Sequence, residues 1–153
     1  MKYLELRITS ISLSGIQSLY KLEKLEKLDI SWNEEVDDSC IELISKLPKL
    51  KVLVMTNLDK VTGLGFVNLS NIRKLNCRAC INLQDNNVID LLRCASNLEL
   101  LNIQCCETIT NSVMDVAIEV TKRRSNNVVL KMIFYNTSIS YDKITDISPL
   151  LSF

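Results

Sequence analysis

The feature that most constrains this chain is an apolar pattern, L-x-x-L-x-L-x-x-(N/C/T), which occurs six times with Ile, Val, Met, Phe or Cys replacing some leucines. The copies start near residues 1, 25, 50, 72, 98 and 129, so successive starts lie 24, 25, 22, 26 and 31 residues apart. A period of about 20–50 residues is typical of arrays of stacked units. We therefore expect one repeat domain over residues 1–153, in which 140–153 form a C-terminal cap or a partial repeat.

The positions within each copy predict a strand followed by a crossover. Apolar positions four and six alternate with their neighbours, as expected of a strand with one buried face. Helical spacing follows in the second, fourth and fifth copies, with N-cap candidates in Asp37-Asp38-Ser39, at Asp85 or Asn86, and at Thr110 or Asn111. The third crossover, Gly63-Leu64-Gly65-Phe66, is too short for more than a turn or two. The pattern predicts an α/β solenoid, a horseshoe arc with about six parallel strands on its concave face and helical crossovers on its convex face.

Position nine carries a small hydrogen-bonding side chain in five of the six copies. Such a side chain can satisfy backbone groups in the turn that leaves the strand, which would otherwise be buried without a partner. We therefore expect a structural ladder formed by Thr9, Asn33, Cys80, Cys106 and Thr137. Leu58 occupies this position in the third copy, which predicts a looser turn there.

Composition argues against several classes of function. The chain has no His and no glycine-rich phosphate loop, which excludes His-dependent catalysis and His-ligated zinc, so we expect neither enzyme activity nor a cofactor. Lys plus Arg and Asp plus Glu each number 18, which disfavours a nucleic-acid partner because its binders usually carry a basic excess. No apolar run reaches the roughly 18–20 residues that span a bilayer, so a membrane partner is not expected. The acidic pairs Glu34-Glu35 and Asp37-Asp38 are interpreted as a solvated turn and a helix cap rather than a metal site.

The six cysteines lie between Cys40 and Cys106, in a chain long enough to form a core without disulfides. Because the sequence also starts without an apolar leader, we expect a reduced intracellular location, cytoplasmic or nuclear. Cys77 and Cys80 form a C-x-x-C that could be a zinc or redox pair. Their positions, six toward the core and nine in the turn, favour a structural role instead. Cys105, at position eight, is expected to be exposed.

Two segments, Leu75-Asn-Cys-Arg-Ala-Cys80-Ile-Asn-Leu83-Gln-Asp85 and Leu101-Asn-Ile-Gln-Cys-Cys106-Glu-Thr-Ile109-Thr110, carry a family resemblance. They resemble the cysteine-containing leucine-rich repeats of F-box/leucine-rich-repeat proteins. The resemblance implies a module that holds the substrate of a ubiquitin ligase. Met1 already lies in the first repeat, so we expect no F-box here. Small mitochondrial assembly factors carry similar repeats without an F-box, which makes a scaffold or assembly factor within a larger complex, and a mitochondrial location, the alternative.

Positions three, five, seven and eight are expected to point outward from the concave face. The side chains there include the only Trp of the chain, and Trp, Tyr and Arg are the usual hot-spot residues of protein interfaces. The predicted protein-binding residues are Arg7, Lys27, Asp29, Trp32, Thr56, Lys74, Asn76, Arg78, Asn102, Gln104 and Tyr135. The competing interpretation is that Trp32 packs against its neighbours. The terminal strands are also expected to offer free edges, which invite end-to-end association between chains.

Overall fold

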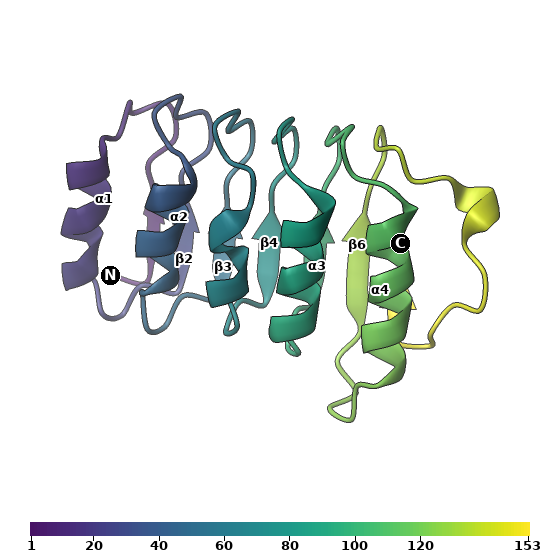
Figure 1. Cartoon of the computed structure of the whole chain (residues 1–153). Coiled ribbons are helices and arrows are strands. Elements are labelled where there is room, and N and C mark those ends of the chain that lie inside the picture. The colour runs from purple at the N-terminus through teal and green to yellow at the C-terminus, as the bar shows by residue number, and fades with distance from the viewer.

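The computed structural model describes residues 1–153 as one sheet of seven parallel strands in sequence order, with the helices on one side of the sheet (Figure 1). The strands are β1 (Tyr3–Glu5), β2 (Lys27–Asp29), β3 (Val52–Val54), β4 (Lys74–Asn76), β5 (Leu100–Asn102), β6 (Leu130–Ile133) and β7 (Leu151–Ser152). The predicted α/β class with parallel strands is confirmed. No helix of the chain has both the length and the apolar character needed to cross a membrane.

The strand register explains the leucine pattern of the sequence. The middle residues of successive strands are direct partners, so position four forms one continuous row of Leu4, Leu28, Leu53, Leu75, Leu101 and Met132. The last five of these side chains are fully buried. Because neighbours on a strand point to opposite faces, positions three and five lie on the other side of the sheet.

The seventh strand exceeds the predicted number. Leu151 pairs with Leu130 of β6, and the Leu130 N–H donates to the Leu150 carbonyl at 2.8 Å. The Phe153 ring meets the Phe134 ring edge-on, with 5.5 Å between centroids. Residues 140–153 therefore add a short strand to the sheet. The sequence did not reveal it because β7 is two residues long and lacks the L-x-x-L-x-L spacing.

The crossovers differ in length. They contain α1 (Leu13–Ser18), η1 (Leu19–Lys21), α2 (Asp38–Ser45), η2 (Leu64–Asn68), α3 (Asp85–Cys94), α4 (Asn111–Lys122) and η3 (Tyr141–Lys143). The carboxylate of Asp37 caps α2 by accepting from the Cys40 N–H at 3.1 Å, and the Thr110 hydroxyl caps α4. The expected cap of α3 was wrong, because the cap position belongs to Gln84, whose side chain makes no capping bond.

The third crossover is the short one that the sequence predicts. Its 3₁₀ helix η2 follows Gly63, whose φ of +95° lies in the left-handed region that favours glycine. Gly65 lies against α2, where an added Cβ would come within 3.1 Å of the Glu42 nitrogen. Phe66, which follows Gly65, is fully buried. The glycines thus allow a crossover of one tight turn to bring Phe66 into the core.

Polar side chains at the starts of the crossovers tie neighbouring units together. The Asp38 carboxylate accepts from the Thr62 hydroxyl at 2.7 Å and from the Gly63 N–H at 2.9 Å. Asp85 accepts from the Thr110 N–H at 2.9 Å. These carboxylates occupy positions that the sequence had assigned to helix caps. Their partners lie one unit further along the chain, so they stabilise the stacking of units rather than a single helix.

Position eight of all six predicted copies adopts a left-handed backbone conformation. The residues are Ile8, Trp32, Asn57, Ala79, Cys105 and Asn136, with φ between +54° and +61°. The third copy has the same turn, since Asn57 has φ of +58° and Leu58 is fully buried. The looser turn expected from Leu58 is therefore not observed. Leu58 fills the position with apolar volume, and the turn geometry does not depend on a polar side chain there.

We expect Ile8→Asn to raise the free energy of unfolding by about 1 kcal/mol. Ile8 has φ of +54°, a conformation that strains a β-branched residue and that Asn tolerates. Its side chain is 76% exposed, so little burial is lost. Urea denaturation followed by circular dichroism measures the change. Ile8→Val keeps the β-branch and should leave stability unaltered. An Asn variant no more stable than the Val variant would contradict the strain argument.

Candidate functional site

The helices lie on one side of the sheet (Figure 1). On the opposite side, the strand register places three rows of side chains that run across the strands. The register defines the lysine row as Tyr3, Lys27, Val52, Lys74, Leu100 and Lys131. It defines the amide row as Glu5, Asp29, Val54, Asn76, Asn102 and Ile133. The turn row follows two residues after the amide row and contains Arg7, Ser31, Thr56, Arg78, Gln104 and Tyr135. Together the three rows are called the sheet face.

The predicted binding residues differ in how accessible they are. Six are exposed: Arg7, Lys27, Trp32, Lys74, Arg78 and Tyr135. Thr56, Asn76 and Gln104 are half-buried. Asp29 and Asn102 are only 9% exposed, which corrects the expectation that they are open contact residues.

The side chains of Asp29 and Asn102 each bond to the residue two positions on. The Asp29 carboxylate accepts from both the N–H and the hydroxyl of Ser31, at 3.0 and 2.6 Å. The Asn102 side-chain oxygen accepts from the Gln104 N–H at 3.0 Å. Short polar side chains form such local bonds readily at the ends of strands. Their hydrogen-bonding capacity is therefore largely used within the chain.

At the β1 end of the sheet face, the charged residues neutralise one another. The Arg7 guanidinium lies 3.8 Å from Glu5 and 4.0 Å from Asp29. The Tyr3 hydroxyl donates to Glu5 at 2.7 Å, and this bond to a carboxylate raises the Tyr3 pKa. The Lys27 ammonium lies 4.7 Å from the centre of the Tyr3 ring. The two carboxylates at this end of the face are therefore paired with Arg7, whereas Lys27 contacts only an aromatic ring and has no ion pair.

Trp32 lies just after β2, at the edge where the strands lead into their turns. The residue is 48% exposed, and its backbone N–H donates to the Thr56 carbonyl at 2.9 Å. The backbone is therefore held by the neighbouring unit while about half of the residue's surface remains open. Ile8 and Tyr135, which follow β1 and β6, are also exposed.

Asn33 connects the first two units. Its amide donates to the carbonyls of Leu6 and Ile30 at 2.7 and 2.8 Å. Its side-chain oxygen accepts from the N–H groups of Thr9 and Ile11, both at 3.1 Å. One side chain thus satisfies four backbone groups in two adjacent turns.

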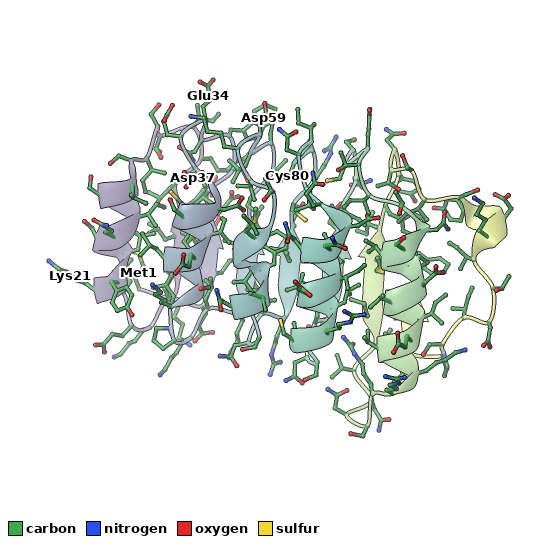
Figure 2. All side chains as sticks on the ribbon, viewed as in Figure 1. Met1, Lys21, Glu34, Asp37, Asp59 and Cys80 are labelled. Carbon is green, nitrogen blue, oxygen red and sulfur yellow. The ribbon has the colours of Figure 1, made fainter.

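The later ladder positions use weaker donors. The Cys80 thiol donates to the Met55 carbonyl at 3.0 Å, and the Cys106 thiol donates to the Cys77 carbonyl at 3.2 Å. The Thr137 hydroxyl bonds only to nearby residues of its own unit, donating to the Phe134 carbonyl and accepting from the Ile139 N–H. Figure 2 shows Cys80 inside the molecule, where the chain passes from β4 toward α3.

The buried thiols are poorly suited to thiolate chemistry. Burial raises the pKa of Cys80 to about 12 and that of Cys106 to about 11, and it raises the pKa of Cys77 well above its usual value. A thiolate is the reactive and metal-binding form of cysteine. The C-x-x-C formed by Cys77 and Cys80 is therefore held in its neutral form. Cys105 is half-buried and contacts Asn136 of the next unit.

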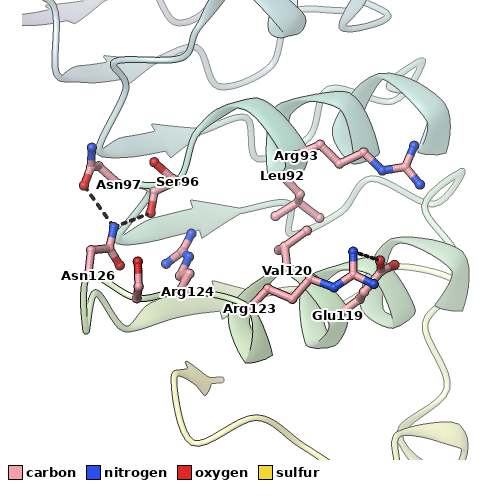
Figure 3. A pocket seen from close by; sticks show the side chains of 10 residues that line it. Leu92, Arg93, Ser96, Asn97, Glu119, Val120, Arg123, Arg124 and Asn126 are labelled. Atoms are coloured by element: carbon pink, nitrogen blue, oxygen red, sulfur yellow. Dashed lines mark hydrogen bonds and ion pairs between the residues drawn. The ribbon is translucent and has the colours of Figure 1, made fainter.

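A hollow of about 660 Å³ between the ends of α3 and α4 is a polar feature that the sequence did not predict (Figure 3). Arg93, Arg123 and Arg124 line it, with Arg93 and Arg123 toward one end and Arg124 at the other. Arg123 pairs with Glu119 at 2.8 Å. Arg124 donates to the Leu98 and Val128 carbonyls, and its second terminal nitrogen, Nη2, is buried without a partner. Because the guanidinium groups do not converge, we interpret them as cations at two helix ends, Arg93 in the last turn of α3 and Arg123 and Arg124 at the end of α4, where cations oppose the helix dipole.

Compared with known proteins, the chain matches no protein-family model and no curated protein sequence.

Proposed function

We propose that the chain is a leucine-rich-repeat solenoid that binds another protein with its sheet face and with Trp32, which adjoins the turn row of that face. The observation that carries this proposal is the open surface around β2 to β6, where Trp32, Arg78 and Tyr135 are exposed. Arg78 makes no ion pair within the chain, although eight other pairs of charged residues do. Large aromatic and Arg side chains that a protein leaves open are typical anchors of protein interfaces.

The absence of His and the neutral state of the buried thiols favour binding over catalysis. The six repeated patterns and the single row of buried leucines support stacking of leucine-rich repeats. Within this class we propose the role of substrate-recognition repeats in an F-box ubiquitin-ligase adaptor. The support is the resemblance of 75–85 and 101–110 to the cysteine-containing subclass. The second candidate is a scaffold or assembly factor without an F-box. An F-box encoded upstream in the full-length gene would favour the first.

The test is affinity capture with the Trp32→Ala/Arg78→Ala double variant. We expect the double variant to retain less than about a tenth of the specific partner captured by the natural chain, because each hot-spot side chain contributes about 2 kcal/mol or more. Quantitative mass spectrometry of the material captured from cell extract measures this ratio. The circular dichroism spectrum should be unchanged, since both side chains are exposed.

The matched control is Tyr20→Ala/Arg93→Ala, which also removes one exposed aromatic and one exposed Arg but lies outside the sheet face. It should capture the same partner as the natural chain. Undiminished capture by Trp32→Ala/Arg78→Ala would refute the assignment of the sheet face.

A further inference from the structure

Three lysines are evenly spaced across the sheet face. They are Lys27 on β2, Lys74 on β4 and Lys131 on β6. The strand register pairs Val52 of β3 with the first two lysines and Leu100 of β5 with the last two. Adjacent strands lie about 4.8 Å apart, so successive lysines of this row are separated by about 10 Å. The lysines are exposed, and the two apolar residues between them are half-buried. Along the row from β2 to β6, exposed cations therefore alternate with half-buried apolar side chains.

These lysines are not neutralised by the chain itself. None of the eight ion pairs includes Lys27, Lys74 or Lys131, and Arg78, which follows β4 in the turn row, is also without an ion pair. The sheet face holds five cations but only two carboxylates, Glu5 and Asp29, and both of those lie within 4.0 Å of Arg7. From β3 to β6, the only charged side chains of the sheet face are cations.

The chain as a whole is neutral, so its acidic residues must lie elsewhere. Figure 2 shows two of them, Glu34 and Asp59, projecting from the loops along the upper edge of the molecule. A third, Asp37, is the N-cap residue of α2, on the side of the sheet that the helices cover. Charge is therefore separated within a neutral protein, and its sheet face complements an anionic partner.

The spacing of the lysines favours a particular kind of anion. A peptide in the polyproline II conformation has three residues per turn and rises about 3.1 Å per residue, so every third side chain recurs on one side after about 9 Å. This repeat is close to the separation of about 10 Å between successive lysines. A single-stranded nucleic acid would instead need aromatic platforms for its bases. The sheet face has no aromatic side chain from β3 to β5.

We infer that the sheet face binds an acidic, extended segment of a partner protein, which crosses β2 to β6 with a carboxylate at every third residue facing Lys27, Lys74 and Lys131. This inference rests on the proposed function and deepens it by naming the chemistry of the partner. The half-buried Val52 and Leu100 contact the apolar part of the segment between the carboxylates. Affinity falls as salt is added, because exposed ion pairs are screened.

The probe is a synthetic peptide of three Glu-Pro-Pro triplets, which favours polyproline II and carries a carboxylate at every third residue. Two comparison peptides contain three Gln-Pro-Pro triplets, or the same three Glu placed together before six Pro. Titration of the intact chain, followed by its amide chemical shifts at low salt, gives both the affinity and the location. We expect the Glu-Pro-Pro peptide to bind about tenfold more tightly than either comparison peptide, since an exposed ion pair contributes up to about fivefold. The shifts should follow β2 to β6.

Lys74→Glu/Lys131→Glu should reduce the affinity for this peptide by more than about tenfold. Lys21→Glu/Lys143→Glu reverses two exposed lysines away from the sheet face and should bind as the natural chain does. Equal binding of the three peptides, or equal binding by both variants, would overturn the inference. The same holds if oligothymidylate or anionic lipid vesicles displace the peptide and bind more tightly through the same lysines. None of these results would contradict the proposed function. That function is tested separately, by whether Trp32→Ala/Arg78→Ala loses the captured partner.

Discussion

The Phe66→Ala variant is expected to lose about 3–5 kcal/mol of the free energy of unfolding, the usual cost of removing a buried aromatic ring. Phe66 is among the largest fully buried side chains of the protein. It also belongs to the shortest crossover, where the 3₁₀ helix η2 has no long apolar stripe that could fill the space. A cavity left here cannot be closed by sliding a helix, because Gly65 already packs against α2.

Urea denaturation of Phe66→Ala, followed by circular dichroism, measures this loss. Val67→Ala is the matched control, since Val67 is the next residue of the same turn but is 50% exposed, and it should change stability by less than about 0.5 kcal/mol. A loss below about 1.5 kcal/mol in Phe66→Ala would show that the crossover repacks, contrary to the geometry around Gly65.

Asn33→Ala should be the second large loss, about 3 kcal/mol, because each buried polar group left without a partner costs about 1–3 kcal/mol. Asn33 is 1% exposed, and its side chain serves backbone groups of Leu6, Thr9, Ile11 and Ile30. Removal of the amide leaves these groups unpaired in two adjacent turns. The damage should therefore extend into the first unit, and hydrogen exchange at the Thr9 and Ile11 amides should accelerate along with the drop in stability.

Cys80→Ala is the comparison for Asn33→Ala, since it changes the same position of another unit. It removes one thiol–carbonyl bond to Met55 and a small volume, which should cost about 1 kcal/mol. Equal losses in the two variants would mean that position nine acts only by filling space. Unaltered exchange at Thr9 and Ile11 would likewise contradict the role of Asn33 as a link between units.

Asp29 and Asp38 show where reasoning from the sequence stopped. The period of the repeat places both residues correctly along the chain, Asp29 in a strand and Asp38 at the start of a helix. Their partners could not be inferred in the same way. Asp29 folds onto Ser31 and lies near Arg7 of the previous unit, while Asp38 reaches Thr62 and Gly63 of the next one. The contacts of Asp29 with Arg7 and of Asp38 with Thr62 and Gly63 depend on which residues adjacent units bring together, and this register is not visible in a single copy of the pattern.

The candidate site was predicted to a similar degree. Alternation along each strand identifies the outward positions, so Lys27, Lys74 and Arg78 could be named without a structure. The burial of Asn102 and the ion pairs of Arg7 could not be predicted in this way. Both result from contacts within the folded chain, of Asn102 with Gln104 and of Arg7 with Glu5 and Asp29. The hollow between α3 and α4 was also missed, since no repeated pattern marks the place where two crossovers end.

The repeated leucines by themselves determined that this chain forms parallel strands joined by crossovers, with one buried row and outward rows of known membership. They could do so because each unit buries apolar residues at the same L-x-x-L-x-L spacing. This burial is a local requirement that every unit meets in the same way. Only the tertiary structure decided the rest: the seventh strand, the left-handed turn at every position eight, the polar links between units and the cations that stay unpaired. The seventh strand, the polar links and the unpaired cations depend on distances between residues of different units. Those distances are set when the units stack, and no single unit encodes them.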